Sequence, residues 1–337
     1  MKKRLPYKAV FLSLCGALLA AIVISAMLGR YPITAKEVGG VMLSQFFDIE
    51  KFWKPIVESL LLQTRLPRIF LACLVGCSLC AAGASYQGVF QNPMASPDVL
   101  GASGGAAFGA ALAILLGMTK GMIVAFAFGA SLLCVGLVIL VGNRTKGKRV
   151  VGLVLAGIMI SSLFSSGTSY IKLVADPNDQ LPAITYWLMG SLNGAMPSDV
   201  YFALIPMAIG LIPLLLLRWR INLLTLGEQE AKTMGIHTGR LRLVVIFCAT
   251  LVTAAAVSVS GVIGWVGLVI PHLARRLVGN DYRKLLPTAM VMGALFLLLV
   301  DDVSRNALAT EIPIGILTSL IGAPFFIYLM TKDGERV

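Results

Sequence analysis

The amino-acid sequence predicts an all-α integral membrane protein with about ten transmembrane helices. Of its 337 residues, 58% are hydrophobic and only 13% are charged, and the mean hydropathy is +0.87. A soluble globular chain carries about 25% charged residues, so this chain lacks the polar side chains that would cover a soluble globule. The same hydrophobicity excludes a disordered chain, which needs a low apolar content.

Stretches without a charged residue give the number of helices. A membrane-spanning helix needs about 20 apolar residues, whereas the strands of a membrane barrel are much shorter. We expect ten spans, at residues 9–29, 66–88, 98–117, 121–142, 150–172, 199–217, 243–262, 266–278, 285–304 and 313–331. The first apolar stretch is longer than that of a signal peptide, so we expect it to remain as an uncleaved helix.

Two charge-free stretches do not fit a single span. Residues 243–274 contain Gly261, Gly264 and Gly267, so we expect one helix to end near residue 262 and a short one to begin near residue 266. Residues 180–198 contain two prolines and are flanked by aspartates, which indicates a short surface or re-entrant helix.

The distribution of basic residues predicts the orientation. An even number of spans places both termini on one side, and Lys and Arg concentrate on the cytoplasmic side. With the N-terminus inside, the inner segments hold 19 of the 28 Lys and Arg residues. We therefore predict that both termini are cytoplasmic, and the net charge of +12 requires no nucleic acid as a partner.

Residue patterns that carry catalysis are scarce. His237 and His272 stand outside any Cys–His or HExxH metal motif. The six cysteines fall in apolar spans, where Cys acts as a small apolar residue. Residues 142–149 fit GxxxxGK, but they lack the Ser or Thr that a P-loop offers to Mg²⁺, so we interpret them as a basic inner loop. We expect no catalytic, metal-binding or cofactor-binding residue in this chain.

Small residues mark helix faces that pack closely or line a pathway. Gly101, Gly105 and Gly109 form two GxxxG steps, which favour close helix packing in lipid. The fifth span carries a serine stripe, for which two interpretations stay open. Its hydroxyls bond to the carbonyl groups four residues earlier in a packed interface, or they line a hydrated pathway. The stripe consists of Ser161, Ser162, Ser165, Ser166 and Ser169.

The cytoplasmic loop at about residues 219–242 is the most informative polar segment. We expect Thr225 to cap a short helix, with Glu228 at the capping-box position, and Gly235 to end that helix. Leu226, Ala231 and Met234 are apolar positions on it. Such a loop is either a solvated spacer or a knob that enters a partner's groove, and its exposed apolar residues favour the knob.

Six motifs in order along nearly the whole chain carry a family resemblance. They lie at residues 65–68, 83–101, 187–192, 226–235, 264–272 and 313–324. With these motifs, the chain resembles the permease subunits of bacterial ABC importers for iron–siderophore, haem and cobalamin, the FecCD-type uptake permeases.

The resemblance implies one permease domain over residues 1–337, folded as a type II ABC importer-like bundle of ten helices. It implies a homodimer with the pathway on its two-fold axis, two cytoplasmic ATP-binding subunits and an extracytoplasmic substrate-binding protein. The partner subunits would bind ATP and Mg²⁺, so this chain is not itself an enzyme. The expected location is the cell membrane of a bacterium or archaeon.

The resemblance also assigns roles to residues. The inner loop would enter a groove of the ATPase through Thr225, Leu226, Gly227, Glu228, Ala231, Met234, Gly235 and Ile236. Outer arginines would meet acidic residues of the binding protein, and these are Arg65, Arg68 and Arg305. The fifth and tenth helices would line the pathway, and an inner gate would lie near residues 143–151.

We therefore expect ATP-driven import of an iron complex, either a siderophore or haem, by alternating access. Cobalamin or a molybdate-like oxyanion is the alternative substrate within the same transporter class. An ATPase-independent secondary transporter and a membrane scaffold that moves nothing are the alternatives from other classes.

Overall fold

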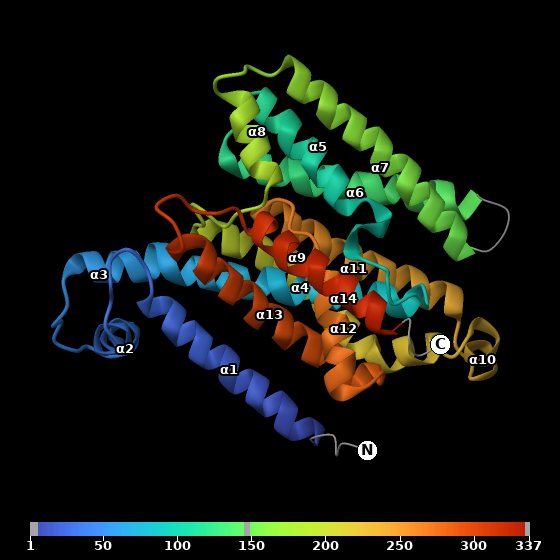
Figure 1. Ribbon diagram of the computed structural model, residues 1–337, viewed down its shortest axis with the longest axis horizontal. Helices are drawn as coiled ribbons and strands as arrows, with labels where there is room; N and C mark the ends of the chain where they lie inside the picture. The colour runs from blue at the N-terminus through green and yellow to red at the C-terminus, as the bar shows by residue number, and fades with distance from the viewer. Residues whose placement is uncertain (1–5, 145–148, 334–337) are drawn as a thin grey trace.

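The computed structural model describes residues 6–144 and 149–333, which form helices and no strand (Figure 1). Helices satisfy every backbone group within one segment, as the hydrocarbon of a bilayer requires. Ten helices coincide with the expected segments: α1 (Tyr7–Met27), α4 (Leu66–Val89), α5 (Ala102–Leu115), α6 (Lys120–Arg144), α7 (Arg149–Val174), α9 (Pro197–Leu224), α11 (Thr238–Ser260), α12 (Val266–Val278), α13 (Tyr282–Asn306) and α14 (Ile314–Asp333).

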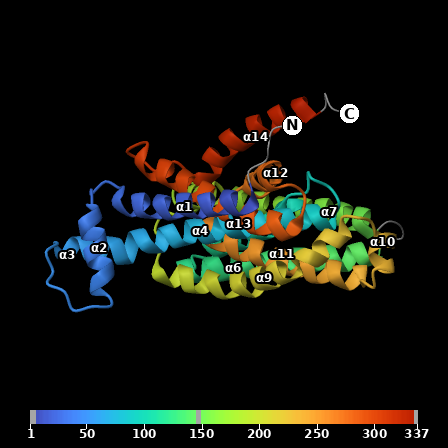
Figure 2. The same ribbon diagram turned by 90° about the horizontal axis from the view of Figure 1, so that it is seen from below.

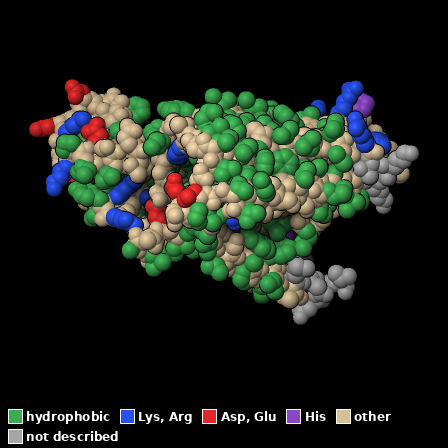
Figure 3. Space-filling view, turned by 90° about the horizontal axis from the view of Figure 1, so that it is seen from above, with side chains coloured by type: hydrophobic (Ala, Val, Ile, Leu, Met, Phe, Trp, Pro, Cys, Tyr) green, Lys and Arg blue, Asp and Glu red, His purple; other side chains and the backbone are tan. Residues whose placement is uncertain are grey.

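Within the described chain, seven helices are long and apolar enough to cross a membrane by length and composition. Helix α5 and the Ile314–Tyr328 part of α14 are shorter apolar helices. In the space-filling view, mostly hydrophobic side chains cover the middle of the molecule, and Lys and Arg gather toward its two ends (Figure 3). This distribution is typical of a helical bundle whose long axis crosses a bilayer.

Helix α4 runs through the middle of the bundle, with α1 and α13 on one side and α5 to α8 beyond its other side (Figure 1). Most residues of α4 and α11 are buried, whereas most of α1 and α9 face outward. Helix α14 stands away from the rest when the molecule is seen from below (Figure 2). The well-packed centre is therefore α4 with α11 and α13.

Glycines let α4 approach its neighbours at backbone distance. A Cβ at Gly76 would overlap the carbonyl oxygen of Gly293 on α13, and one at Gly83 would overlap the carbonyl oxygen of Gly267 on α12. In lipid no hydrophobic force draws apolar helices together, so close packing of this kind holds them. The expected packing role of Gly105 is also present, because a Cβ there would lie 2.6 Å from the Ala130 carbonyl oxygen of α6.

Backbone hydrogen bonds join three segments: the one after α8, the end of α11 and the start of α14. The N–H of Ser191 donates to the carbonyl of Ser260 at 2.7 Å, and the N–H of Ile314 donates to the carbonyl of Gly190 at 2.8 Å. These bonds tie the short helix α8 (Gln180–Leu188) to the end of α11 and the start of α14. The break between α11 and α12 and the short helix at 180–198 both lie where the glycines and prolines predicted them.

One end of the molecule holds structure that the charge-free stretches did not predict. Helix α2 (Ala35–Ser44) begins with a capping box formed by Thr34 and Glu37. Helix α3 (Pro55–Ser59) and the π-helical turn η1 (Leu60–Arg65) continue directly into α4. At other positions the short elements are the 3₁₀ turn η2 (Pro97–Leu100), α8 and α10 (Glu228–Thr233).

We predict that Gly83→Leu destabilises the bundle, since the new side chain has no space between α4 and α12. Overpacking of this kind costs about 1–3 kcal/mol or more. The change should lower the thermal unfolding temperature of the purified protein in detergent. Gly136→Leu on α6 is the matched control, because a Cβ at Gly136 meets nothing within 4 Å. Equal unfolding temperatures for the two variants would contradict the glycine-packing account.

Candidate functional site

The loop after α9 forms one end of the molecule, where α10 projects (Figure 1). Gly235 has φ +77° and its N–H donates to the carbonyl of Lys232 at 2.9 Å, so it ends α10 as the sequence predicts. Gly227, with φ +127°, precedes α10 and serves as its N-cap. Both positive φ angles suit glycine, which bears no Cβ.

The expected capping role of Thr225 is wrong. Helix α9 continues to Leu224, so Thr225 ends that helix and its hydroxyl donates to the carbonyl of Asn222 at 2.7 Å. A Thr hydroxyl that lies close to an unpaired carbonyl at a helix C-terminus donates to that carbonyl, so it does not cap the next helix. The side chain of Glu228 lies outside the described part of the structure.

The apolar residues of this loop divide into two groups. Ala231 is fully buried against its own chain, whereas Leu226 and Met234 are 56% and 57% exposed. Ile236 is half-buried. Ala231 therefore anchors α10, and the two large apolar side chains lie just before and just after it. An exposed Leu and Met flanking an anchored short helix would suit the expected knob.

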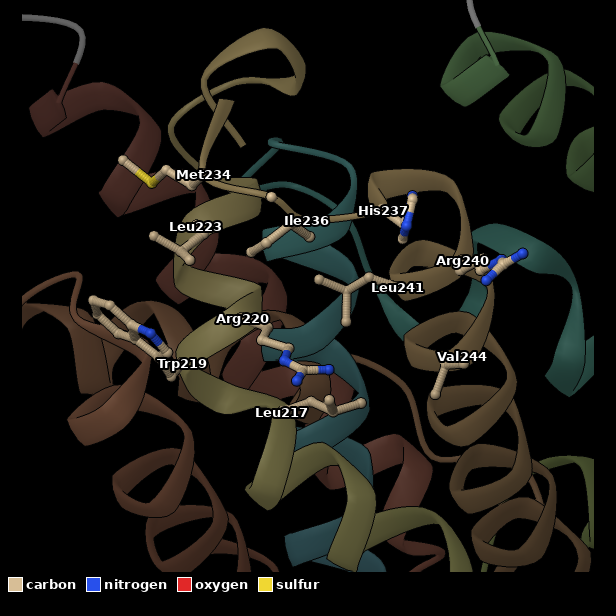
Figure 4. Close-up of a pocket in the computed structure, with 11 residues that line it drawn as sticks. Leu217, Trp219, Arg220, Leu223, Met234, Ile236, His237, Arg240, Leu241 and Val244 are labelled. Carbon is tan, nitrogen blue, oxygen red and sulfur yellow. The ribbon is translucent and has the colours of Figure 1, made fainter. Parts of the chain in front are cut away.

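A groove lies beside α10, between the end of α9 and the start of α11, and we call it the α9–α11 groove (Figure 4). It has a volume of about 700 Å³. It is lined by Leu217, Trp219, Arg220, Leu223, Met234, Gly235, Ile236, His237, Arg240, Leu241 and Val244.

The serine stripe of α7 is split by the structure. Ser162, Ser166 and Ser169 are exposed, and each hydroxyl donates to the carbonyl four residues earlier at 2.9–3.0 Å. Ser165 is exposed on the same helix. Ser161 instead packs against Gly101, and its Oγ is buried without a hydrogen-bond partner among the described residues. Four serines thus remain on an uncovered face of this single chain.

Two faces on the expected pathway helices are uncovered in the single chain. On α7, Leu163 and Leu173 are exposed, and on α14 Leu320 and Ile327 are exposed. The segment expected to form an inner gate falls partly on residues 145–148, which lie outside the described residues. The arrangement leaves room for a second protein surface or lipid along α7 and α14.

Arginines and carboxylates form a buried cluster at the opposite end, near α3. Arg68 donates from Nε and Nη2 to Asp301 at 2.9–3.1 Å, and from Nη1 and Nη2 to Glu311 at 3.0 Å. Arg305 bonds Asp302 and the backbone carbonyl of Ser25. The cluster thus ties α1, α4 and α13 together with the loop before α14.

Arg65 completes the cluster without a carboxylate. Its guanidinium donates to the carbonyl groups of Ala26 at 2.7 Å and Met27 at 3.0 Å, and also to that of Tyr31. The carbonyls of Ala26 and Met27 lie in the last turn of α1, where a helix C-terminus leaves acceptors unpaired. The structure thus places Arg65, Arg68 and Arg305 together. The exposed fraction of each residue is below one tenth.

The three arginines nevertheless line a pocket of about 260 Å³ that also includes Arg30, Asn306 and Glu311. Their contact with a binding protein stays a prediction. The local pair between Asp301 and Arg305 is present, with Oδ2 and Nε 3.8 Å apart. The closer partner of Asp301 is Arg68, which lies far away in the sequence and was not expected there.

The comparisons with known proteins identify the family. The model of the FecCD transport family matches residues 17–332. The chain belongs to the FecCD transport family.

Individual FecCD relatives cover nearly the whole chain. A molybdate import permease of Haemophilus influenzae is 39% identical over 330 residues, which are 97% of this chain and 96% of that protein. A protein of Helicobacter pylori named as a probable iron chelatin transport system permease is 44% identical, over 81% of this chain and 82% of its own. A solved inward-facing structure of a metal-chelate type ABC transporter has a TM-score of 0.86 and 37% identity, covering 96% of this chain and 99% of that one. The chain is therefore a multi-pass membrane permease.

We predict that Asp301→Ala strongly destabilises the protein, because it leaves the buried Arg68 with Glu311 as its carboxylate partner. Breaking a buried ion pair costs about 3–5 kcal/mol. The unfolding temperature in detergent should fall, and Glu311→Gln should lower it less because the Glu311 side chain is 20% exposed.

The double change Arg68→Met with Asp301→Asn is the matched control, since it removes both charges and nearly keeps the side-chain volumes. It should recover much of the lost stability. Unchanged stability of Asp301→Ala would show that the pair does not hold these helices together.

Proposed function

We propose that this chain is the permease subunit of a binding-protein-dependent ABC importer, with ten spans and both termini in the cytoplasm. The observation that carries the proposal is α10, a short anchored helix that projects from one end of a FecCD-type bundle with Leu226 and Met234 exposed. The larger share of Lys and Arg in the segments on that side supports a cytoplasmic position for it.

The permease acts as a homodimer. The uncovered faces of α7 and α14 support this, because a second copy would cover apolar residues such as Leu173 and Leu320. The exposed hydroxyls of Ser162, Ser165, Ser166 and Ser169 then border the pathway. Since three of these hydroxyls already bond to their own helix, they offer a weakly polar wall that releases a passing solute.

Two partner ATPase subunits bind and hydrolyse ATP with Mg²⁺ and move the bundle through α10. Closure of the ATPases pushes on Leu226 and Met234, and the buried Ala231 passes that motion to α9 and α11, between which α10 lies. The pathway then opens to one side at a time. A hydrolysis site on this chain is not needed for this cycle.

A substrate-binding protein docks at the arginine cluster on the outer end. The pocket formed by Arg30, Arg65, Arg68 and Arg305 presents positive charge to carboxylates on such a partner. The carboxylates inside the cluster hold the guanidinium groups in place before docking.

The substrate that we propose is an iron complex, a siderophore or haem, because the H. pylori relative is named for an iron chelatin and the solved relative for metal chelates. A molybdate-like oxyanion is the second candidate, because the H. influenzae relative carries that name over almost the full chain. Cobalamin is the third.

Purification of the tagged chain should bring with it an ATP-binding subunit, and the complex should drive uptake in proteoliposomes only with ATP and the binding protein. The cognate binding protein, isolated with its ligand, then identifies the cargo. Uptake by this chain alone, driven by a proton or sodium gradient, would overturn the proposal in favour of a secondary transporter.

We predict that Met234→Glu uncouples ATP hydrolysis from transport, because a charge replaces an apolar contact at the ATPase surface. ATP-driven uptake in proteoliposomes should fall at least about tenfold while the dimer remains intact by size-exclusion chromatography. Met234→Leu is the control and should retain uptake. Normal uptake by Met234→Glu would remove α10 from the coupling mechanism.

For docking, we predict that Arg65→Lys and Arg305→Lys weaken association with the binding protein by about tenfold. Lys keeps the charge but loses the planar fork that binds carboxylates. Charge reversal is avoided because both side chains are buried. Lys51→Arg, exposed at the same end, is the control. If affinity is unchanged at equal unfolding temperature, these arginines do not dock the partner.

A further inference from the structure

The α9–α11 groove is lined by apolar residues and by two arginines. Leu217, Leu223, Leu241 and Val244 supply apolar surface, and Arg220 points into the space between the two helices (Figure 4). Arg240 lies at the α11 rim, and the groove lining contains no Asp or Glu. The groove is therefore apolar and positively charged at once.

Arg220 and Arg240 are available for a ligand. Within the described chain, neither side chain makes a hydrogen bond, an ion pair or a ring contact, and both are exposed. Other arginines at this end are engaged, as Arg283 is with Asp281 and with the ring of Trp219 at 4.7 Å. The arginines favour an anion, and the neighbouring apolar side chains favour a ligand that also carries an apolar part.

The groove opens toward the membrane rather than only toward the solvent. Below it, the outer face of α9 continues with Ile212 and Leu216, which are 56% and 77% exposed, and that of α11 continues with Phe247, which is 57% exposed. Trp219 stands at the rim, in the position that aromatic residues take at the membrane surface. A lipid reaches such a groove by lateral diffusion within its own leaflet.

We propose that the α9–α11 groove binds an anionic phospholipid of the cytoplasmic leaflet. The phosphate lies at Arg220, with Arg240 nearby, and an acyl chain lies along Leu217, Leu241 and Val244. Basic pockets between transmembrane helices on the cytoplasmic side hold anionic head groups in this way. The proposal rests on the orientation given under the proposed function. Because the groove adjoins α10, the lipid would brace the helix that couples the ATPase to the bundle.

Tryptophan fluorescence tests the proposal in the complete complex with its ATPase subunits, reconstituted in phosphatidylcholine nanodiscs. Phosphatidylglycerol brominated in its acyl chains is titrated in, and brominated phosphatidylcholine serves as the neutral comparison. Subtracting the signal of the Trp219→Phe complex isolates the quenching of Trp219. One arginine near the surface favours an anionic lipid by about fivefold. Half-maximal quenching should therefore need at least about fivefold less brominated phosphatidylglycerol than brominated phosphatidylcholine.

Variants separate the groove from general surface charge. Arg220→Gln should bring the two lipids to nearly equal midpoints, and Arg218→Gln, two residues earlier on α9 and outside the groove, should leave the preference intact. Val244→Phe fills the floor and should also reduce the preference, although both arginines remain.

Equal midpoints in the wild type, equal losses in Arg218→Gln and Arg220→Gln, or no effect of Val244→Phe would each overturn the lipid site. A preference that is present in the permease alone and lost on adding the ATPase subunits would assign the groove to that interface instead. Failure of any ATPase subunit to co-purify would count against the proposed function, and the lipid preference of the permease alone would still be measurable.

Discussion

The backbone contacts of α4 with α12 and α13 support the rest of the molecule. In a bilayer, lipid tails are as apolar as Leu side chains, so burial alone does not hold helices together. At Gly76 and Gly83 the absence of a side chain lets α4 touch the carbonyl groups of its neighbours. The peripheral helices then pack around this centre and leave their outer faces to lipid.

The apolar surroundings also restrict where charged side chains are placed. Arg68 enters the interior only because Asp301 and Glu311 receive it with paired hydrogen bonds, since an unpaired buried charge is costly. The cluster fixes α1, α4, α13 and the loop before α14 at one end. At the other end Arg220 and Arg240 of the α9–α11 groove have no such partners among the described residues, and Leu226 and Met234, which flank α10, are exposed. The buried charges at one end are thus paired within the chain, whereas at the other end arginine and apolar side chains are exposed.

Much of the helix pattern was predictable because a bilayer requires long apolar segments, and an unpaired backbone group within such a segment is costly. The glycines at 261–267 marked the end of α11, and the prolines and aspartates around 180–198 marked α8. The capping role of Thr225 was wrong because α9 extends to Leu224, so the Thr225 hydroxyl donates to the Asn222 carbonyl of α9 and does not accept from an N–H of α10. Helix α2 was missed although Thr34 and Glu37 form a readable capping box, because its ten residues are too few to span a membrane.

The sequence by itself determined the all-helical membrane class, the ten apolar segments and the family, because composition, segment length and motif order are local properties of the chain. Only the tertiary structure decided which residues meet across the sequence. It paired Arg68 with Asp301, buried the arginines expected on the surface, separated Ser161 from the other serines, and placed Arg220 between α9 and α11. Such contacts depend on how helices cross, which glycine positions and packing set in three dimensions and which no single segment encodes.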